Sequence, residues 1–169
     1  MPEFGPYETA QALLRDELWR CWLCVEAQIR HRWALGALPR TEDGGQGTWT
    51  TDTIAGVFRA ALGEYHGQSA IRGDDAGWAQ VQAMFQHHSL LVDARIGATL
   101  QAGIRLPFLD LCVRFQLNRA QRLTLAFALM PEIDPKLLVA YRYLSNDPQC
   151  RSLDARLLAT LVYLSLIHI

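Results

Sequence analysis

The chain has 169 residues, of which 50% are hydrophobic and 20% charged, and its formal net charge is −1. This apolar content is enough to bury a sizeable core in one domain or two small ones. Residues 1–103 carry 8 arginines against 12 acidic groups, while residues 104–169 carry 7 arginines and one lysine against 5 acidic groups. The basic excess of the second part is too small for a nucleic-acid-binding stripe.

Neither a secretory signal nor a membrane span is recognisable in the sequence. The first residues, MPEFGPYET, lack a basic segment followed by an apolar one. The longest mostly apolar run, Leu157–Ile169, has about 13 residues, whereas a bilayer span needs about 20. We therefore expect a cytoplasmic protein with reduced thiols and no membrane contact.

Three helices with loops between them are predicted before residue 104. The first is expected over Tyr7–Leu35, because apolar residues recur at steps of three and four (Leu14, Leu18, Cys21, Trp22, Val25, Ile29, Trp33). A second is expected over Asp52–Tyr65, between a polar loop at 40–51 and another at 67–77. The third, Trp78–Gln101, has an apolar stripe and a C-terminal cap at Gly103 (Trp78, Val81, Phe85, His88, Val92, Ile96, and Thr99 or Leu100). Gly97 is a candidate break within it.

The second part of the chain predicts four shorter helices. Pro107 fits the first turn of one, and Asn118 with Gln121 forms a capping-box pair that starts the next, Arg119–Met130. That helix becomes apolar on all sides from Leu125 onward, so we expect it to be the central buried element, stopped by Pro131. Two more helices are predicted, Lys136–Leu144 after Asp134-Pro135 and Leu153–Leu164 after a turn at 146–148.

These patterns predict a mostly α-helical protein. Residues 1–103 are expected to form a helical bundle or hairpin region, and residues 104–163 a compact helical, winged-helix-like domain. Residues 164–169, LSLIHI, continue an apolar run without a cap and end abruptly. We interpret them as a non-native tail on a chain that is naturally longer.

Cysteine and histidine do not form a set with metal-ligand or redox spacing. Cys21 and Cys24 make a lone CxxC inside a predicted helix, and Cys112 and Cys150 are isolated, so we interpret the thiols as structural. The side chains of His87 and His88 diverge by about 100° on a helix; His88 is expected to pack and His87 to face solvent. His31 and His66 have no partner that the sequence identifies.

We interpret one short motif as loop sequence and another as a chance match. Gly44-Gly45-Gln46-Gly47 lacks the lysine and the preceding strand of a phosphate-binding loop. Arg72-Gly73-Asp74 is an integrin tripeptide in a chain without a secretion signal.

Four arginines could line one face of a helix-turn-helix and contact phosphates (Arg105, Arg114, Arg119, Arg122). Because the second half of Arg119–Met130 is too apolar to enter a groove, we favour structural or partner-facing arginines.

Residues 104–162 also carry a pattern that resembles a known family. The pattern comprises Arg105–Pro107, Leu109–Leu111, Phe115–Leu117, Leu123–Leu129, Pro131–Asp134 and Tyr143–Asp147. Over roughly residues 85–162 it resembles the N-terminal region of certain bacterial AAA-type ATPases, in which a helical, winged-helix-like domain precedes the ATPase module. The ATP-binding Walker motifs of that family would lie downstream, so the resemblance gives this chain no catalytic residue.

The resemblance implies a non-catalytic accessory region that recognises a partner or substrate, or regulates the motor. We expect no cofactor or metal here, with ATP and Mg²⁺ confined to a full-length parent that hydrolyses ATP and through which the chain could oligomerise. The expected partner is a protein or the downstream ATPase module, with nucleic acid the weaker choice. The alternative is a winged-helix DNA-binding or transcription-associated module, and a small CxxC redox enzyme ranks below both.

Overall fold

The computed structural model describes residues 5–38, 56–57, 77–147, 149 and 153–167. In this part of the chain the ordered elements are helices, and no strand is found there. They are α1 (Ala10–Ala34), α3 (Gly77–Gln101), α4 (Pro107–Arg114), α5 (Arg119–Ile133), α6 (Lys136–Ser145) and α7 (Ala155–Ile167). The mostly α-helical prediction is confirmed.

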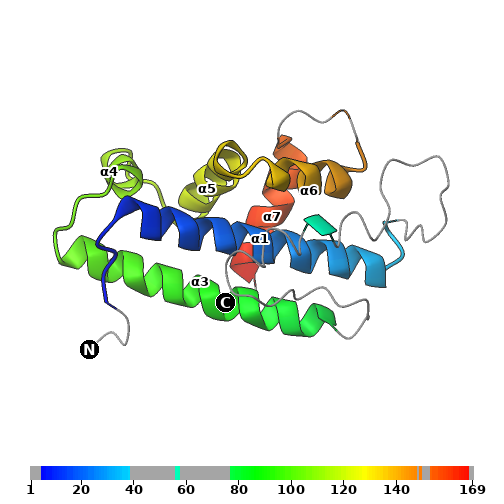
Figure 1. Cartoon of the computed structure of the whole chain (residues 1–169), viewed down its shortest axis with the longest axis horizontal. Coiled ribbons are helices and arrows are strands. Elements are labelled where there is room, and N and C mark those ends of the chain that lie inside the picture. Colours follow the sequence, from blue (N-terminus) through cyan, green and yellow to red (C-terminus); the bar gives the residue numbers. More distant parts are fainter. Residues whose placement is uncertain (1–4, 39–55, 58–76, 148, 150–152, 168–169) are drawn as a thin grey trace.

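The helices are arranged around α1. α1 packs along α3 over most of its length, and α4, α5 and α6 lie on the other side of α1 (Figure 1). α7 crosses the middle of the molecule and contacts α1, α5 and α6. α1 is therefore enclosed by helices that come from both parts of the chain.

The burial of α1 is more complete than its sequence pattern predicts. Thr9 caps the helix by accepting a hydrogen bond from the N–H of Ala12 at 3.2 Å. Every residue from Glu17 to Arg30 is buried, on all faces of the helix and not on one apolar stripe. The central buried element is thus α1, and the prediction that Arg119–Met130 takes this place is wrong.

α3 agrees closely with its predicted stripe. Its buried residues are spaced three and four apart along one face (Val81, Phe85, Ser89, Val92, Ile96, Thr99). The helix runs through Gly97 without a break. Gly103 has a φ of +67°, a conformation that suits glycine at a helix end.

α5 begins as the sequence predicts. The side chain of Asn118 accepts from the N–H of Gln121 at 3.0 Å, and the Gln121 side chain accepts from the N–H of Asn118 at 2.9 Å. This reciprocal pair is the predicted capping box. One face of the helix is buried (Leu123, Ala126, Phe127, Met130), but Leu129 is 36% exposed. Burial on all sides from Leu125 onward is therefore not observed.

Pro131 does not stop α5, which continues to Ile133. Proline has no N–H, so it leaves the carbonyl four residues earlier, that of Phe127, without its helical donor. The hydroxyl of Tyr141 on α6 donates to this carbonyl at 3.0 Å, and both side chains are fully buried. A donor from a neighbouring helix thus satisfies the group that Pro131 frees, and the expected stop becomes an interior position.

Aspartate side chains accept backbone hydrogen bonds at the starts of the last two helices. The Asp134 carboxylate accepts from the N–H of Lys136 at 3.1 Å, and that of Asp154 accepts from the N–H of Leu157 at 2.6 Å. α6 ends at Asn146, whose φ of 53° is left-handed. Leu157, Leu161 and Val162 of α7 are buried as predicted, while Leu153 and Leu158 are half-buried.

A single hydrophobic core contains residues from both predicted regions. α1 and α3 from residues 1–103 share it with α4–α7 from residues 104–163, and the division at 103/104 stays a prediction. α7 extends to Ile167, and the interpretation of 164–169 as non-native also stays a prediction. Among the described helices, none has the length and apolarity of a membrane span.

Several predicted features fall wholly or largely outside the described residues. The second helix, Asp52–Tyr65, is described only at 56–57, which are helical. The loops at 40–51 and 67–77, except Gly77, also lie outside, together with the Gly44–Gly47 and Arg72–Asp74 motifs, His66 and Cys150.

Candidate functional site: a buried charge cluster and the surface of α4

Cys21 and Cys24 lie in the middle of α1 and are buried, as predicted. Burial, together with the nearby charge of Glu17, raises the pKa of the Cys21 thiol well above its ordinary value. A thiol in this state resists forming the thiolate that metal binding and redox exchange need. Within the described residues, His, Cys, Asp and Glu nowhere gather in a group of three or more that could hold a metal ion.

The histidines take the positions that their helical spacing predicts. His88 is half-buried, with its Nε2 2.8 Å from the carbonyl oxygen of Asp16 and its ring edge-on to Trp19. His87 is exposed. His31, for which the sequence identifies no partner, lies with its ring centroid 5.3 Å from that of Trp78. These contacts join α1 to α3.

A charge cluster joins α1, α3 and α5 at one point. Asp93 of α3 pairs with three arginines: Arg20 of α1 at 3.1 Å, Arg119 of α5 at 2.7 Å, and Arg122 of α5. Arg20 also pairs with Glu17, and both of these side chains are fully buried. We call these five residues the Asp93 cluster. It places three cations around two carboxylates between the three helices.

The Asp93 cluster is mostly shielded from solvent, with Glu17 and Arg20 fully buried and the other three side chains partly buried. Burial works against the charge of Arg20, but the carboxylates of Glu17 and Asp93 hold its pKa above the ordinary value. Glu17 Oε1, Arg20 Nε and Arg122 Nε are buried without a hydrogen-bond partner. The chemistry of the cluster is therefore that of a structural clamp between helices, in which each charge stabilises its neighbours.

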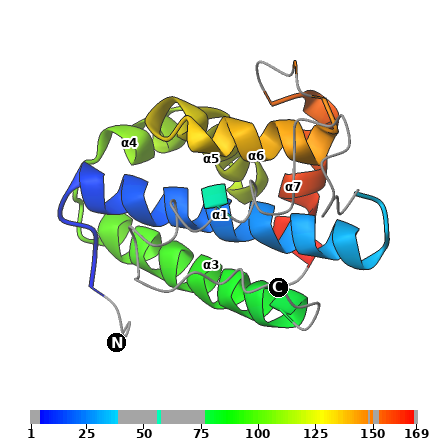
Figure 2. The same ribbon diagram turned by 45° about the vertical axis from the view of Figure 1, so that its right-hand side comes forward.

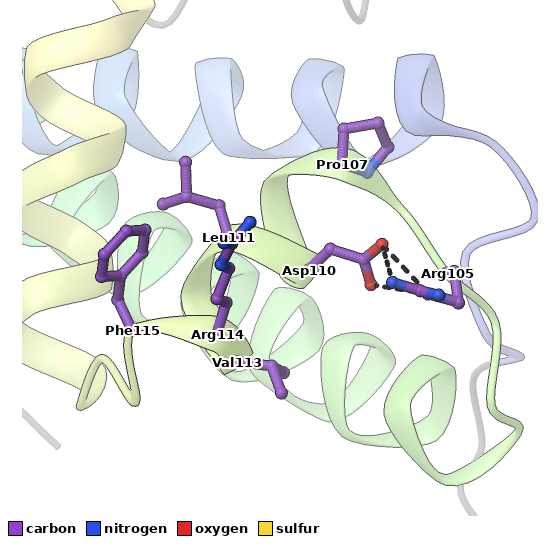
Figure 3. Close-up of a pocket in the computed structure, with 7 residues that line it drawn as sticks. All are labelled: Arg105, Pro107, Asp110, Leu111, Val113, Arg114 and Phe115. Atoms are coloured by element: carbon purple, nitrogen blue, oxygen red, sulfur yellow. Dashed lines mark hydrogen bonds and ion pairs between the residues drawn. The ribbon is translucent and has the colours of Figure 1, made fainter.

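The four arginines considered as a DNA-contacting face do not share one. Arg119 and Arg122 point into the Asp93 cluster, which confirms the structural interpretation for these two. Arg105 pairs with Asp110 at 3.1 Å on the surface, and Arg114 is exposed (Figure 3). Sequence reasoning missed Asp93, Glu17 and Arg20, although a Glu–Arg pair three residues apart within an apolar helix was a usable signal.

The outward surface of α4 carries large apolar side chains. Leu109 and Cys112 are buried, but Leu111, Val113 and Phe115 are 41%, 59% and 66% exposed. In the close-up, Phe115 lies on the same side as Leu111 and Arg114, and Val113 points away from them (Figure 3). We call Leu111, Val113, Arg114 and Phe115 the α4 surface. Exposed apolar side chains beside a cation are typical of surfaces that contact proteins.

The chain matches one family model. A model for a winged helix domain variant covers residues 1–166. Comparisons with curated proteins and with solved structures found no match. Because the family match spans nearly the whole sequence, the chain belongs to the winged helix domain variants.

Proposed function

We propose that this winged-helix variant is a non-enzymatic recognition module that binds a protein partner through the α4 surface. The observation that carries the proposal is the exposure of Leu111, Val113 and Phe115 beside Arg114. A partner segment with apolar side chains and an acidic flank would complement this surface in shape and charge.

The Asp93 cluster supports a protein partner over duplex DNA. Arg119 and Arg122 occupy the start of α5, where a recognition helix would present cations to phosphates. Their guanidinium groups already pair with Asp93, so using them on DNA would break the clamp. The formal charge of −1 offers little counterion release for the chain as a whole.

For the partner, we propose the remainder of a parent protein, an AAA-type ATPase. The support is the resemblance of residues 85–162 to the helical region that precedes the motor in such proteins. In this proposal ATP and Mg²⁺ bind to the motor, and the winged-helix module positions the motor or selects its substrate. No cofactor or metal is proposed for the module itself.

Duplex DNA binding is the second candidate, favoured by the winged helix family match. The exposed arginines, Arg105 and Arg114, lie together on and beside α4 and would make the phosphate contacts. In this case affinity should fall steeply with salt, by about one power of salt concentration per phosphate contact.

The test measures binding of the module to the separately produced remainder of its parent, by fluorescence anisotropy. Leu111→Asp/Phe115→Asp should weaken binding about tenfold or more, because it places charges in the apolar contact. Leu90→Asp is the matched control, since Leu90 of α3 is 56% exposed on another helix and should bind like the wild type. Equal loss in both variants would argue against the α4 surface.

A parallel titration with duplex DNA at about 0.15 M salt separates the two candidates. Sub-micromolar, salt-sensitive binding that is lost in Arg105→Gln/Arg114→Gln would favour DNA and contradict the protein-contact proposal. These exposed arginines are better targets than Arg119 and Arg122, whose removal would disturb the Asp93 cluster.

A further inference from the structure

A small polar cavity lies where the end of α1, the end of α6 and the start of α7 come together (Figure 2). Its volume is about 280 Å³. Side chains from these three helices and their flanks line it (Arg32, Leu38, Leu144, Ser145, Asn146, Asp154, Arg156, Leu157, Thr160). The C-terminal end of α1 and α6 lie at the opposite end of the molecule from α4 (Figure 1), and the cavity shares no lining residue with the α4 surface.

Two arginines, Arg32 and Arg156, line this cavity together with one carboxylate, that of Asp154. Arg32 donates to the carbonyl of Leu144 at 2.6 Å, which leaves its other N–H groups available. Within the described part of the chain, neither Arg32 nor Arg156 has a carboxylate within ion-pair distance. Burial, and then repulsion from Arg156, lowers the pKa of Arg32. Two cations held this close are stabilised by an anion between them.

Asp154 also lines the cavity, but its carboxylate already accepts a backbone hydrogen bond. One of its oxygens accepts from the N–H of Leu157 at 2.6 Å and caps α7. The hydroxyls of Ser145 and Thr160 donate to carbonyls within their own helices, Arg142 and Arg156, respectively. The donors left for a ligand are therefore chiefly the guanidinium groups, with the Asn146 amide beside them.

We propose that this cavity binds a phosphate group between Arg32 and Arg156. Guanidinium groups bind phosphate oxygens through paired N–H donors, and the two arginines outnumber the one carboxylate, that of Asp154, that lines the cavity. The cavity is at or below the lower end of the range for drug-sized ligands, so it fits a phosphate with a small substituent and not a whole nucleotide. Such a group can come from a small phosphorylated compound or from a phosphorylated side chain of a protein.

The proposal is tested by titrating the whole chain with inorganic phosphate at constant ionic strength, followed by ¹H–¹⁵N NMR. The expected result is saturable shifts centred on the amides of Asn146, Arg156 and Thr160. Arg156→Gln should weaken binding about tenfold or more, the value of one charged hydrogen-bonding partner. Arg114→Gln, an exposed arginine on α4, should bind phosphate like the wild type.

Two further measurements complete the experiment. Arg32→Gln should weaken binding similarly, and far-UV circular dichroism shows whether loss of its bond to Leu144 has altered the fold. A phosphoserine peptide that binds about tenfold tighter than inorganic phosphate would identify a phosphorylated protein as the source, and equal affinity a small compound. A Kd above about 10 mM, or equal loss of binding in Arg114→Gln and Arg156→Gln, would overturn the proposal.

Discussion

Asp93 is the residue on which the packing of three helices most depends. It is the shared acceptor for Arg20, Arg119 and Arg122, so its removal leaves three cations close together and partly buried. Asp93→Ala should lower the free energy of unfolding by about 2–4 kcal/mol, below the value for a fully buried pair because solvent reaches part of the cluster. Urea denaturation measures this difference.

The matched control for Asp93 is Asp110→Ala. Asp110 pairs with Arg105 on the surface, where an ion pair contributes at most about 1 kcal/mol. A loss at Asp93 no larger than that at Asp110 would show that the Asp93 cluster does not hold the helices together.

Glu26 gives the protein a defined dependence of stability on pH. It is fully buried on α1 and paired with Arg30 at 3.0 Å. Burial nevertheless raises its pKa above the ordinary 4.5, while Arg30 acts in the opposite direction. The folded state thus holds the proton of Glu26 more tightly than the unfolded state, so this residue costs stability as the pH rises above 4.5 towards the folded pKa.

The pH effect of Glu26 is checked by urea denaturation at several values between about pH 4.5 and 7. The stability of the wild type relative to Glu26→Gln should fall as the pH rises through this interval. Leu90→Ala, at an exposed position of α3 without a titratable group, should give a constant difference from the wild type. A wild-type advantage that grows with pH would show the opposite sign of linkage.

The charge network could not be predicted from the sequence because its members are far apart along the chain. Asp93 lies 73 residues from Arg20 and 26 from Arg119, and nothing local marks these residues as partners. A side chain with a partner close in sequence was predictable, as for Asn118 with Gln121. The Arg32–Arg156 cavity was missed for the same reason as Asp93.

At the scale of elements, α5 has one buried and one partly exposed face. Phe127 is fully buried, whereas Leu129, two residues later, is 36% exposed. Phe127→Ala should lower the free energy of unfolding by about 3–5 kcal/mol. Leu129→Ala should cost less, about 1–2 kcal/mol, because about a third of its surface stays in contact with water. Similar melting temperatures for the two variants would mean that α5 does not pack as described.

The bond between Tyr141 and the Phe127 carbonyl exists because Pro131 lacks an N–H. Tyr141→Phe should therefore cost about 1–3 kcal/mol, the penalty for leaving a buried carbonyl unsatisfied. In a Pro131→Ala background the alanine N–H can reach that carbonyl, so the same tyrosine substitution should cost less. A double-mutant cycle measured by urea denaturation gives the coupling directly, and additive losses would contradict this account.

The positions of the helices were predictable from the sequence, but the other helices that pack against each of them were not. Local signals such as the capping box at Asn118 and the cap at Gly103 fixed where helices begin and end to within a few residues. Whether Pro131 ends a helix depends on Tyr141 of another element, and whether α1 is buried on one side or all sides depends on α5, α6 and α7. Sequence periodicity shows which face of a helix is apolar, but it does not show how many neighbouring helices pack against that helix.

At the scale of the whole molecule, the packing of both predicted regions depends on α1. α1 belongs to residues 1–103 but contacts α5, α6 and α7 of the second region. A fragment of residues 104–169 should therefore lack a fixed core and show poorly dispersed NMR spectra. The full chain should unfold in a single transition, coincident by fluorescence and circular dichroism. A well-dispersed spectrum from the fragment would support two separate domains.

The enclosure of α1 also affects how the chain folds during its synthesis. Its residues leave the ribosome before those of every helix that covers it, and α7 comes about 120 residues later by chain position. Contacts between segments so far apart close slowly, and buried faces stay open until their partners arrive. α1 is thus synthesised before the helices that cover it, and its apolar surface stays uncovered until α7 has emerged.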